Sequence, residues 1–342
     1  MLEGLVESVA NSGIASEVCL AAYSKESIPL SLRRSQRLKI FELHESFLSS
    51  ERALSGLTRE KETVFVSPYP KLPLLGCYCV SVHTVHDILD LTHAAYRKRV
   101  KALFDAYRLK VALRKADLTW YDSVWSREET RRYFGSVGKN PRVRYPALSE
   151  TFTPGGSGSG GEILQKHNLS PGYILALGNG KPHKNLGLLL SLSRHIHREL
   201  VFVGVPQQNR RYWASVHPNE SAIWIEQVSE PDILILMQNA FCLAQPSTAE
   251  GYGYPPLEAM ACGVPAVVSN IPVLVETTGG NAITVDPHKP QEWVDAFQAL
   301  EDYTRNQAHV QRGFNWVVSL KGRKGWQGHI SDLEDLLRRT KA

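Results

Sequence analysis

The sequence predicts an α/β protein made of two doubly wound domains, each with a parallel sheet covered by helices. Its 342 residues suffice for two domains of ~100–200 residues each. A stretch rich in glycine and serine, residues 154–161, divides the chain near its middle and has the composition of a linker. On both sides of it, short apolar segments alternate with helical patterns. This alternation is typical of parallel sheets whose strand ends hold ligands in a cleft.

In the second half, short apolar segments alternate clearly with segments of helical periodicity, which predicts strands and helices in turn. The expected strands are Tyr173–Leu177, Leu200–Val203, Ile223–Ile225, 241–244 and 264–269. The expected helices are 185–196, 230–239, 256–262 and 291–300.

The first half is less regular but follows the same plan. We expect strands at 17–22, 38–43, 63–67, Val80–Val85 and 117–120, and a long helix from 94 to about 116. The predicted domains are therefore 1–153 and 162–305, joined by the linker 154–161. Residues 306–342 form a helical segment that we expect to return to the first domain.

The composition excludes several classes of protein. A hydrophobic content of 43% with mixed charges indicates a soluble globular chain. The net charge of +5 is too small to indicate a nucleic-acid partner by itself. Five cysteines without a two-residue spacing predict reduced thiols, as in the cytoplasm. No apolar run reaches the ~18–20 residues that cross a bilayer, and the acidic start does not resemble a signal peptide.

The stretch EGYGYPPLE, residues 250–258, follows an expected strand and opens an expected helix. Gly251 and Gly253 allow the backbone to approach a ligand closely, and free amides at a helix start favour anionic groups. One carboxylate could stabilise positive charge on a reacting sugar carbon, and the other could accept hydrogen bonds from a ribose. The alternative, equally open from these residues alone, is that Glu258 complements the helix dipole and Glu250 is solvated.

The segment LGNGKPHKN, residues 177–185, also follows a strand and opens a helix. Lys184 could reach a phosphate at the helix start, and Asn179 or Asn185 could cap the helix. The alternative is a solvated lysine in a turn. This segment lacks the spacing of a P-loop. In the stretch 250–258, Pro256 replaces the third glycine of a dinucleotide fingerprint, which argues against NAD.

His86 closes the expected strand Val80–Val85 and stands beside an aspartate. At the carboxyl end of a parallel strand it would face the cleft, where it could hold a substrate hydroxyl or a developing charge. A purely structural histidine is the alternative, and it is the more common situation. No third ligand at metal spacing is visible, so we expect no metal site.

The expected helix 94–116 combines an apolar face with a basic remainder. We expect the apolar face to pack on the core and the basic residues to be solvated, with peripheral contact to anionic lipid or an acidic acceptor as the alternative. The apolar face contains Tyr96, Val100, Leu103, Phe104, Tyr107 and Val111, and the basic residues are Arg97, Lys98, Arg99, Lys101, Arg108, Lys110, Arg114 and Lys115.

Taken together, these stretches resemble retaining glycosyltransferases of glycosyltransferase family 4, which have the GT-B fold of two Rossmann-like domains with a cleft between them. The most specific part is PSTAEGYGYPPLEAMACGVPAVVSNIPVLVE, residues 246–276, where seven residues separate two carboxylates around a Gly-aromatic-Gly turn. LALGNGKPHKNLGLLL resembles the phosphate-binding segment of the family. VSVHTVHD resembles its mannosyltransferase-like members, and GFNW, residues 313–316, resembles its final helix region.

The resemblance implies a role for each candidate residue. Glu250 would contact the donor sugar near its reacting carbon, and His86 would lie beside the transferred sugar. Lys184 would hold the diphosphate, and Glu258 would bind the ribose hydroxyls. Asn179 stands where many relatives carry arginine, so that one diphosphate clamp is absent or replaced. The donor-binding turn would consist of Gly251, Tyr252, Gly253 and Tyr254.

The implied activity is transfer of a hexose, with a mannose-type sugar favoured, from a GDP- or UDP-linked donor without an obligatory metal. The acceptor would be a glycan or a lipid-linked glycan in polysaccharide or glycoconjugate synthesis, and the enzyme would be cytoplasmic, with peripheral contact to the inner face of the membrane as an option. The family usually begins with a strand and a glycine-rich loop ahead of a helix like LEGLVESVANSG, so we expect this central strand to be missing. The alternatives are a catalytically impaired protein that binds nucleotide sugars or glycans, and a GT-B sugar-nucleotide epimerase.

Overall fold

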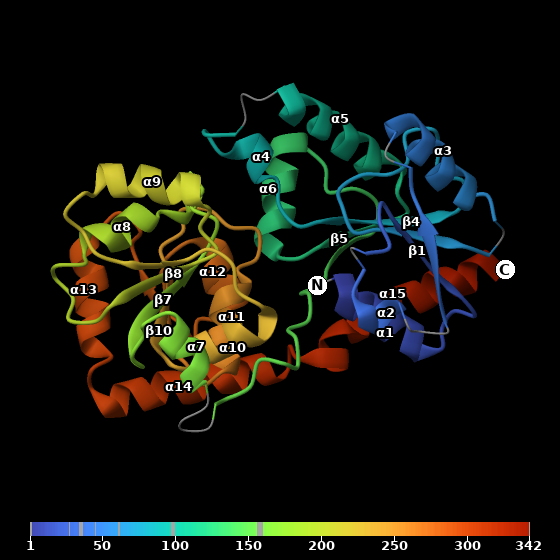
Figure 1. Cartoon of the computed structure of the whole chain (residues 1–342). Helices are drawn as coiled ribbons and strands as arrows, with labels where there is room; N and C mark the ends of the chain where they lie inside the picture. Colours follow the sequence, from blue (N-terminus) through green and yellow to red (C-terminus); the bar gives the residue numbers. More distant parts are fainter. Residues whose placement is uncertain are drawn as a thin grey trace. The chain divides into compact units, whose positions relative to one another are not determined.

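The computed structural model describes residues 2–26, 28–33, 37–44, 46–60, 62–96, 100–155 and 160–341. It divides the chain into a first unit, Met1–Ser149 with Leu320–Ala342, and a second unit, Glu150–Ser319. Each unit is an α/β body with parallel strands, as the sequence predicts (Figure 1). Residues 156–159 of the predicted linker and the basic residues Arg97, Lys98 and Arg99 lie outside the described part of the chain.

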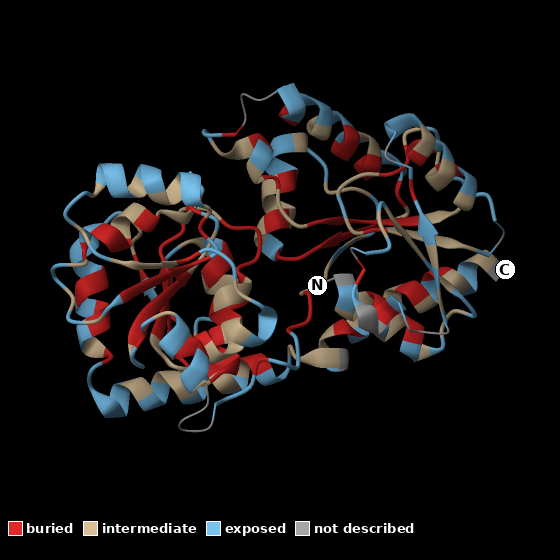
Figure 2. Ribbon diagram, in the orientation of Figure 1, coloured by how far each residue is buried: buried red, intermediate tan, exposed pale blue. Residues whose placement is uncertain are grey.

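The described residues of the second unit form a six-stranded parallel sheet in the order β12-β11-β10-β7-β8-β9. Its central strands are apolar and almost entirely buried, because helices cover both faces of the sheet (Figure 2). The five strands predicted here are confirmed, and the structure contains a sixth, the short edge strand β12, which the sequence did not predict. The bounds are β7 (Tyr173–Leu177), β8 (Leu200–Val203), β9 (Ile223–Ile225), β10 (Ala240–Gln245), β11 (Ala266–Ser269) and β12 (Ile283–Val285).

Helices α8 and α13 supply much of the core on one face of this sheet. Leu189 from α8 and Trp293 and Phe297 from α13 are fully or almost fully buried against Phe202 of β8. The helices of the unit are α7 (Gly161–Lys166), the 3₁₀ turn η1 (Pro182–Lys184), α8 (Leu186–Ser191), α9 (Gln207–Val216), α10 (Glu230–Gln238), α11 (Tyr254–Ala261), α12 (Pro272–Thr277), α13 (Pro290–Ala299) and α14 (Tyr303–Val318).

The described residues of the first unit form a four-stranded parallel sheet, β3-β4-β5-β6, and a separate parallel pair, β1-β2. No strand within the described residues joins the pair to the larger sheet. The strands are β1 (Val18–Ala22), β2 (Leu38–Glu42), β3 (Val64–Ser67), β4 (Val80–Val85), β5 (Leu118–Tyr121) and β6 (Pro141–Val143). The helices are α1 (Leu2–Ser12), α2 (Leu30–Arg33), α3 (Phe47–Leu57), α4 (Leu89–Thr92), α5 (Val100–Lys115), α6 (Val124–Phe134) and α15 (Gly322–Lys341).

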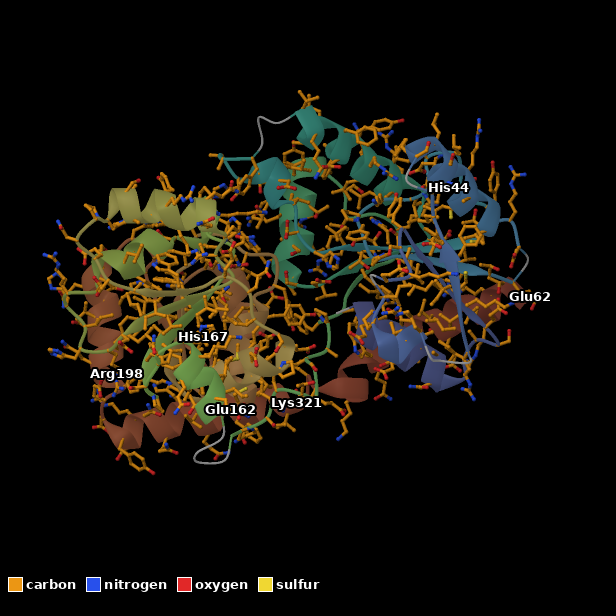
Figure 3. All side chains as sticks on the ribbon, in the orientation of Figure 1. His44, Glu62, Glu162, His167, Arg198 and Lys321 are labelled. Atoms are coloured by element: carbon orange, nitrogen blue, oxygen red, sulfur yellow. The ribbon has the colours of Figure 1, made fainter. Side chains whose placement is uncertain are left out.

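The C-terminal helix α15 is part of the first unit. The chain re-enters this unit at Leu320, and the backbone of the next residue, Lys321, labelled in Figure 3, pairs with that of Leu148. Asp332 of α15 accepts hydrogen bonds from the indole of Trp120, at 2.9 Å, and from the guanidinium of Arg144, at 2.7 and 2.8 Å. Leu333 of the same helix is buried in the hydrophobic cluster that also contains Trp120. The last helix therefore completes the core of the first unit.

Helix α5 turns a different face to the core than the sequence predicts. Val100, Leu103, Phe104 and Tyr107, which we expected to be buried, are 84%, 73%, 46% and 59% exposed. The buried face contains Ala102, Arg108, Leu109, Ala112 and Leu113 instead, and Figure 2 shows exposed and buried positions alternating along the helix.

The reason for this reversal is a buried ion pair. The guanidinium of Arg108 donates to Oε1 of Glu51 on α3, at 2.9 Å, and to the carbonyl of Leu72, at 3.2 Å. The other oxygen of Glu51 accepts a hydrogen bond from the backbone amide of Leu74 at 2.6 Å. Because each charged group finds partners inside the unit, part of the cost of burying this arginine is offset, although its Nε has no hydrogen-bond partner among the described residues. The expectation that it belongs to a solvated basic face is therefore wrong.

Candidate functional site

The turn that links β10 to α11 brings the EGYGYPPLE stretch to the carboxyl edge of the sheet in the second unit. Gly253 is the N-cap of α11 with φ +92°, and a Cβ at this position would lie 2.4 Å from the side chain of Leu274. Pro255 and Pro256 occupy the first turn of the helix, where no amide hydrogen is required. Glycine is thus required sterically, and the helix start faces the end of the sheet at which ligands bind in such folds.

Glu250 is buried at this turn, 8% exposed, and its carboxylate has three donors. Oε1 accepts hydrogen bonds from Nζ of Lys184 at 2.7 Å, Nε2 of Gln245 at 2.8 Å and Oγ of Ser247 at 2.6 Å. No described residue donates to Oε2. The solvated alternative for Glu250 is therefore wrong, and the carboxylate is held in place by one oxygen while the other stays available to a ligand.

The loop that carries Lys184 is fastened to the Glu250 turn by backbone contacts. The amide of Thr248 donates to the carbonyl of His183 at 2.8 Å. Asn185, in the left-handed conformation with φ +51°, donates from its side chain to the carbonyl of Pro246 at 3.1 Å. Its side chain therefore joins two loops instead of capping helix α8. The Lys184–Glu250 pair rests on two loops that are bonded to each other.

Asn179 has a different local role. Its side-chain oxygen accepts a hydrogen bond from the amide of Lys181 at 3.2 Å, and its carbonyl accepts one from the side chain of Asn209 at 2.7 Å. These bonds shape the turn that precedes Lys184, with the side chain of Asn179 on the exposed side.

Glu258 lies one turn into α11. Burial raises the pKa of its carboxyl to about 7, and the charge of Glu230 adds to this shift. No described residue forms a hydrogen bond or ion pair with this carboxylate. A group held near half protonation is well suited to accept hydroxyl donors, since such bonds favour its charged form.

His86 belongs to the first unit and follows β4 directly. The register of the sheet pairs Val85 with Tyr121, which places His86 beside Asp122 at the carboxyl ends of β4 and β5. Nδ1 of His86 lies 2.7 Å from Oδ2 of Asp122, and Nε2 lies 2.6 Å from the carbonyl oxygen of Pro68. Both ring nitrogens therefore face acceptors, an arrangement that suits the doubly protonated imidazolium.

The pKa of His86 reflects two opposed effects. Burial alone lowers it, but the hydrogen bond and negative charge of Asp122 outweigh burial and raise the pKa above its ordinary value. The Pro68 carbonyl and Asp87 act in the same direction. The side chain of Asp87 accepts a hydrogen bond from the amide of Leu89 at 2.9 Å, so the sequence neighbour of His86 shapes the turn that precedes α4. The site thus places a histidine of raised pKa beside the buried carboxylate of Asp122.

A cavity of about 300 Å³ lies beside His86 within the first unit. It combines an aromatic side chain with charges of both signs, a composition that suits a ligand rich in hydroxyl groups. Burial, with the charge of Arg108 adding to it, lowers the pKa of the Lys71 ammonium at its edge. The cavity is lined by Tyr69, Pro70, Lys71, His86, Asp87, Ile88, Asp90, Leu91, Asp105, Arg108 and Leu109.

Sequence reasoning missed Gln245, Ser247 and Asp122, which position Glu250 and His86. Gln245 ends strand β10 and Asp122 directly follows β5, so both are polar residues where an apolar strand stops. The rule that singled out His86, a polar side chain at the carboxyl end of a parallel strand, would have found them. Within the described residues, no cluster of three or more histidine, cysteine or acidic side chains is placed to hold a metal, and none of the described helices has the length and apolarity to span a bilayer.

Comparison with known sequences gives one family model and several curated relatives. Residues 162–313 match the model described as glycosyl transferases group 1. The chain is 30% identical over 258 residues to the O-antigen chain mannosyltransferase B of Escherichia coli, across 69% of this chain and 67% of that protein. It is 29% identical over 224 residues to the O-antigen chain mannosyltransferase RfbU of Salmonella typhimurium, across 64% of this chain and 60% of that one.

Solved structures share the fold over almost the whole chain. The Anabaena protein HepE in complex with UDP-glucose superimposes with a TM-score of 0.77 at 14% identity, over 97% of this chain and 95% of that one. Sucrose-phosphate synthase from Thermosynechococcus elongatus gives a TM-score of 0.74 at 17% identity, over 98% and 91% of the two chains.

Proposed function

The chain belongs to the glycosyl transferases group 1 family and has the GT-B fold of glycosyltransferase family 4, and from this we propose that it is a retaining hexosyltransferase. We propose a mannose-type sugar on a GDP- or UDP-linked donor, without an obligatory metal. The acceptor is a glycan or lipid-linked glycan in polysaccharide or glycoconjugate synthesis, reached at the cytoplasmic face of a membrane. Three relatives named as mannosyltransferases support the choice of sugar.

The observation that carries this proposal is the pairing of Lys184 with Glu250 at a glycine-rich helix start. When the bond between a sugar and a diphosphate breaks, the anomeric carbon becomes positive and the departing oxygen becomes negative. A carboxylate and an ammonium held together match both charges. Without substrate the two charges neutralise each other. When the donor binds, its diphosphate replaces Glu250 as the partner of Lys184, and its anomeric carbon replaces Lys184 as the partner of Glu250.

In this proposal the electrons of the breaking bond pass to the diphosphate, which Lys184 and the backbone amides at the start of α11 stabilise. Glu250 is held by Gln245 and Ser247, so its charge stays in place while Lys184 turns to the diphosphate. The acceptor hydroxyl attacks the anomeric carbon from the side that the diphosphate leaves, and its proton passes to the departing phosphate oxygen. This course retains the configuration of the sugar.

The cavity beside His86 is the proposed site of the acceptor sugar. Tyr69 offers an aromatic surface, and Asp87 and Asp90 offer hydrogen-bond acceptors. Charged His86 would donate to an oxygen of the transferred sugar by exchanging its contact with the carbonyl of Pro68. A donor hydrogen bond from a cation is strong in a site with little water.

The test is incubation of the chain with UDP-, GDP- and ADP-sugars, with and without extracted lipid-linked acceptors. Acceptor-dependent release of nucleotide, with a product that keeps the anomeric configuration of the donor by NMR, is expected. The Glu250→Gln variant should keep donor binding by calorimetry and lose turnover by about 10²–10³-fold. Unchanged turnover in this variant would refute the role of Glu250. Product formed from the nucleotide sugar without acceptor would indicate an epimerase instead.

A further inference from the structure

The loop that precedes β4 contains two cysteines separated by a single residue. Cys77 and Cys79 are both half-buried, so small molecules in the solvent can reach them. The thiol of Cys77 lies 3.9 Å from the carbonyl oxygen of Cys79, and the two thiols are hydrogen-bonded to each other. Their spacing is not the two-residue spacing of common redox motifs, and only the folded loop shows that the thiols meet.

Contacts with neighbouring segments hold this loop in place. The amide of Tyr78, between the two cysteines, donates to Oγ1 of Thr58 at 3.2 Å. The guanidinium of Arg59 lies over the ring of Tyr78, 4.7 Å from its centroid. Beyond the pair, the amide of Ser81 donates to Oδ2 of Asp117 at 2.9 Å. The two thiols are therefore kept side by side on a loop that is fixed at its centre and at its end.

The two thiols differ in acidity. The hydrogen bond from the Cys79 thiol, with a smaller contribution from the hydroxyl of Ser81, lowers the pKa of Cys77. Burial and the negative charge of Asp117 act in the opposite direction but are outweighed. The same hydrogen bond raises the pKa of Cys79, and burial adds to this shift. Because the thiolate is the nucleophilic form of cysteine, Cys77 is the sulfur that attacks and Cys79 is its protonated neighbour.

The other cysteines provide a comparison within the same chain. Cys19 is exposed at the surface, but partial burial of its sulfur, with the charge of Glu17 adding to it, raises its pKa. Cys242 and Cys262 are buried, and burial also raises the pKa of Cys242. Exposure alone therefore favours reaction at Cys19, whereas acidity and a neighbouring thiol favour reaction at Cys77.

We propose that Cys77 and Cys79 are a modification site that a hydroperoxide converts to a disulfide. The thiolate of Cys77 attacks one oxygen of hydrogen peroxide, the O–O bond breaks, and Cys77 becomes a sulfenic acid while hydroxide leaves. The proton that Cys77 has released neutralises the hydroxide. The sulfur of Cys79 then attacks the sulfenic sulfur, the S–O bond breaks, and water leaves with the proton of the Cys79 thiol. The two thiols lose two electrons in total, and the peroxide gains them.

The modification is reversible and lies apart from the candidate site. A disulfide across one residue closes a small ring, and strained disulfides are reduced easily by other thiols. The pair precedes β4, whereas His86 follows this strand of six residues, which is about 20 Å long. Both forms of the pair should therefore bind nucleotide equally, and the proposal does not depend on the proposed function.

Peroxide treatment of the full reduced chain, followed by peptide mass spectrometry, tests the proposal. The tryptic peptide that carries both cysteines should lose two hydrogen atoms, and dithiothreitol should restore them. This disulfide should form at least about tenfold faster than Cys19 forms a sulfenic acid, which dimedone traps. Cys19→Ser is the matched control and should form the disulfide at the wild-type rate.

Substitutions at the pair separate the two roles. Cys79→Ser should stop at the sulfenic acid of Cys77, which dimedone then traps, because the second thiol is gone. Cys77→Ser should leave a thiol at position 79 that reacts more slowly than Cys77 does in Cys79→Ser, because burial still raises its pKa. Phenylarsine oxide, which bonds two neighbouring thiols without an oxidant, should bind the wild type and Cys19→Ser but neither of these two variants.

Four results would overturn the proposal. They are oxidation of Cys19 before the pair, a sulfinic acid on Cys77 of the wild type in place of the disulfide, a disulfide-linked dimer on a non-reducing gel, and arsenical binding that survives in Cys79→Ser. The comparison of Cys19 with Cys77 needs no substitution at the pair, so it decides the question even where a variant unfolds. A chain without turnover that forms the disulfide would refute the proposed function and leave the modification site standing.

Discussion

The ammonium of Lys184 lies 2.7 Å from Oε1 of Glu250, although the two residues are separated by a large part of the second unit's sequence. Both side chains are largely buried, so neither charge has bulk water as an alternative partner. Removing only one partner of such a pair lowers the stability strongly, because the remaining charge stays buried without a partner. This contact therefore links the stability of the second unit to the chemistry of its site.

Removing the ammonium should affect both properties. Lys184→Gln should weaken binding of UDP or GDP about 10–100-fold by calorimetry, because a charge-assisted contact to the diphosphate is lost. It should also lower the free energy of unfolding by about 1–3 kcal/mol, measured with urea. Adding Glu250→Gln should recover part of that stability, because the buried carboxylate is then neutral.

An ion pair elsewhere in the second unit provides the control for Lys184→Gln. Arg198, labelled in Figure 3, binds Glu301 with two hydrogen bonds of 2.7 Å at the protein surface. Glu301→Gln should leave nucleotide binding unchanged and cost little stability, as is usual for exposed pairs. Equal effects of the two single variants would contradict a role of Lys184 in the site.

Glu258 should make donor binding depend on pH. Its pKa is about 7 in the ligand-free protein, and hydrogen bonds from ribose hydroxyls would favour the carboxylate and lower that pKa. Nucleotide affinity should then rise, by up to about tenfold, as the pH increases from about 6 to 8, with release of a proton. Calorimetry in buffers of different ionisation enthalpy measures that proton.

The Glu258→Gln variant should bind with an affinity that no longer changes over this range. The pH dependence of folding stability has the opposite sign to that of nucleotide affinity, because the pKa of the Glu258 carboxyl is higher in the folded than in the unfolded state. The stabilising contribution of protonated Glu258 is complete at low pH and is lost as the pH rises through about 7. Urea unfolding should therefore show a gain from the glutamine at pH 8 relative to pH 5. If nucleotide affinity and unfolding free energy depend on pH identically in the wild type and in Glu258→Gln, Glu258 is not the titrating group at the donor site.

Asp122→Asn should lower the pKa of His86, because burial then acts without the opposing carboxylate. The imidazolium would lose its proton at a lower pH, so turnover should decline on the alkaline side earlier than in the wild type. Titration of the His86 ring followed by NMR measures the shift directly. In the wild type, the raised pKa means that stability from this pair is complete in acid and is lost as the pH rises through the pKa of His86.

The control for Asp122→Asn is Asp87→Asn, since Asp87 is near His86 but bonds to the amide of Leu89. This change should move the pKa of His86 only slightly. If Asp122→Asn lowers turnover equally at all pH values while the NMR titration stays in place, Asp122 acts only in the packing of the unit.

Gly253→Ala should disturb the turn before α11. An alanine here would have to adopt the left-handed backbone of Gly253 and place its Cβ 2.4 Å from the side chain of Leu274. The variant should lower the free energy of unfolding in urea by about 2–4 kcal/mol. Gly280→Ala is the control, because Gly280 has φ +70° with no atom near its Cβ position. It should cost about 1 kcal/mol and leave nucleotide binding unaffected. Equal costs would mean that the contact with Leu274 relaxes freely.

Local sequence predicts most of the second unit because its strands are buried on both faces. Segments such as Leu200–Val203 are apolar at every position, and this pattern needs no information about distant partners. The edge strand Ile283–Val285 was missed because it has only three residues and is incompletely buried. The donor-site candidates could be named from two short stretches, 177–185 and 250–258, whereas the hydrogen bonds of Gln245 and Ser247 to Glu250 require the folded turn.

The first unit shows where local patterns fail. The apolar stripe of α5 was assigned to the core because amphipathic helices usually bury such a face. The decision depends instead on Glu51, which is distant in sequence and gives Arg108 a buried partner. No periodicity within α5 contains that information. The same holds for Asp122, which becomes a partner of His86 through the register between β4 and β5.

The attachment of α15 to Trp120 and Arg144 through Asp332 has a consequence for biosynthesis. The second unit is continuous in sequence and can fold while the ribosome is still translating. The first unit, although its strands are synthesised earlier, needs α15 to cover β3, β4 and β5. The apolar strands of the first unit therefore stay uncovered until the whole second unit has been synthesised. During this interval we expect the nascent chain to need chaperones.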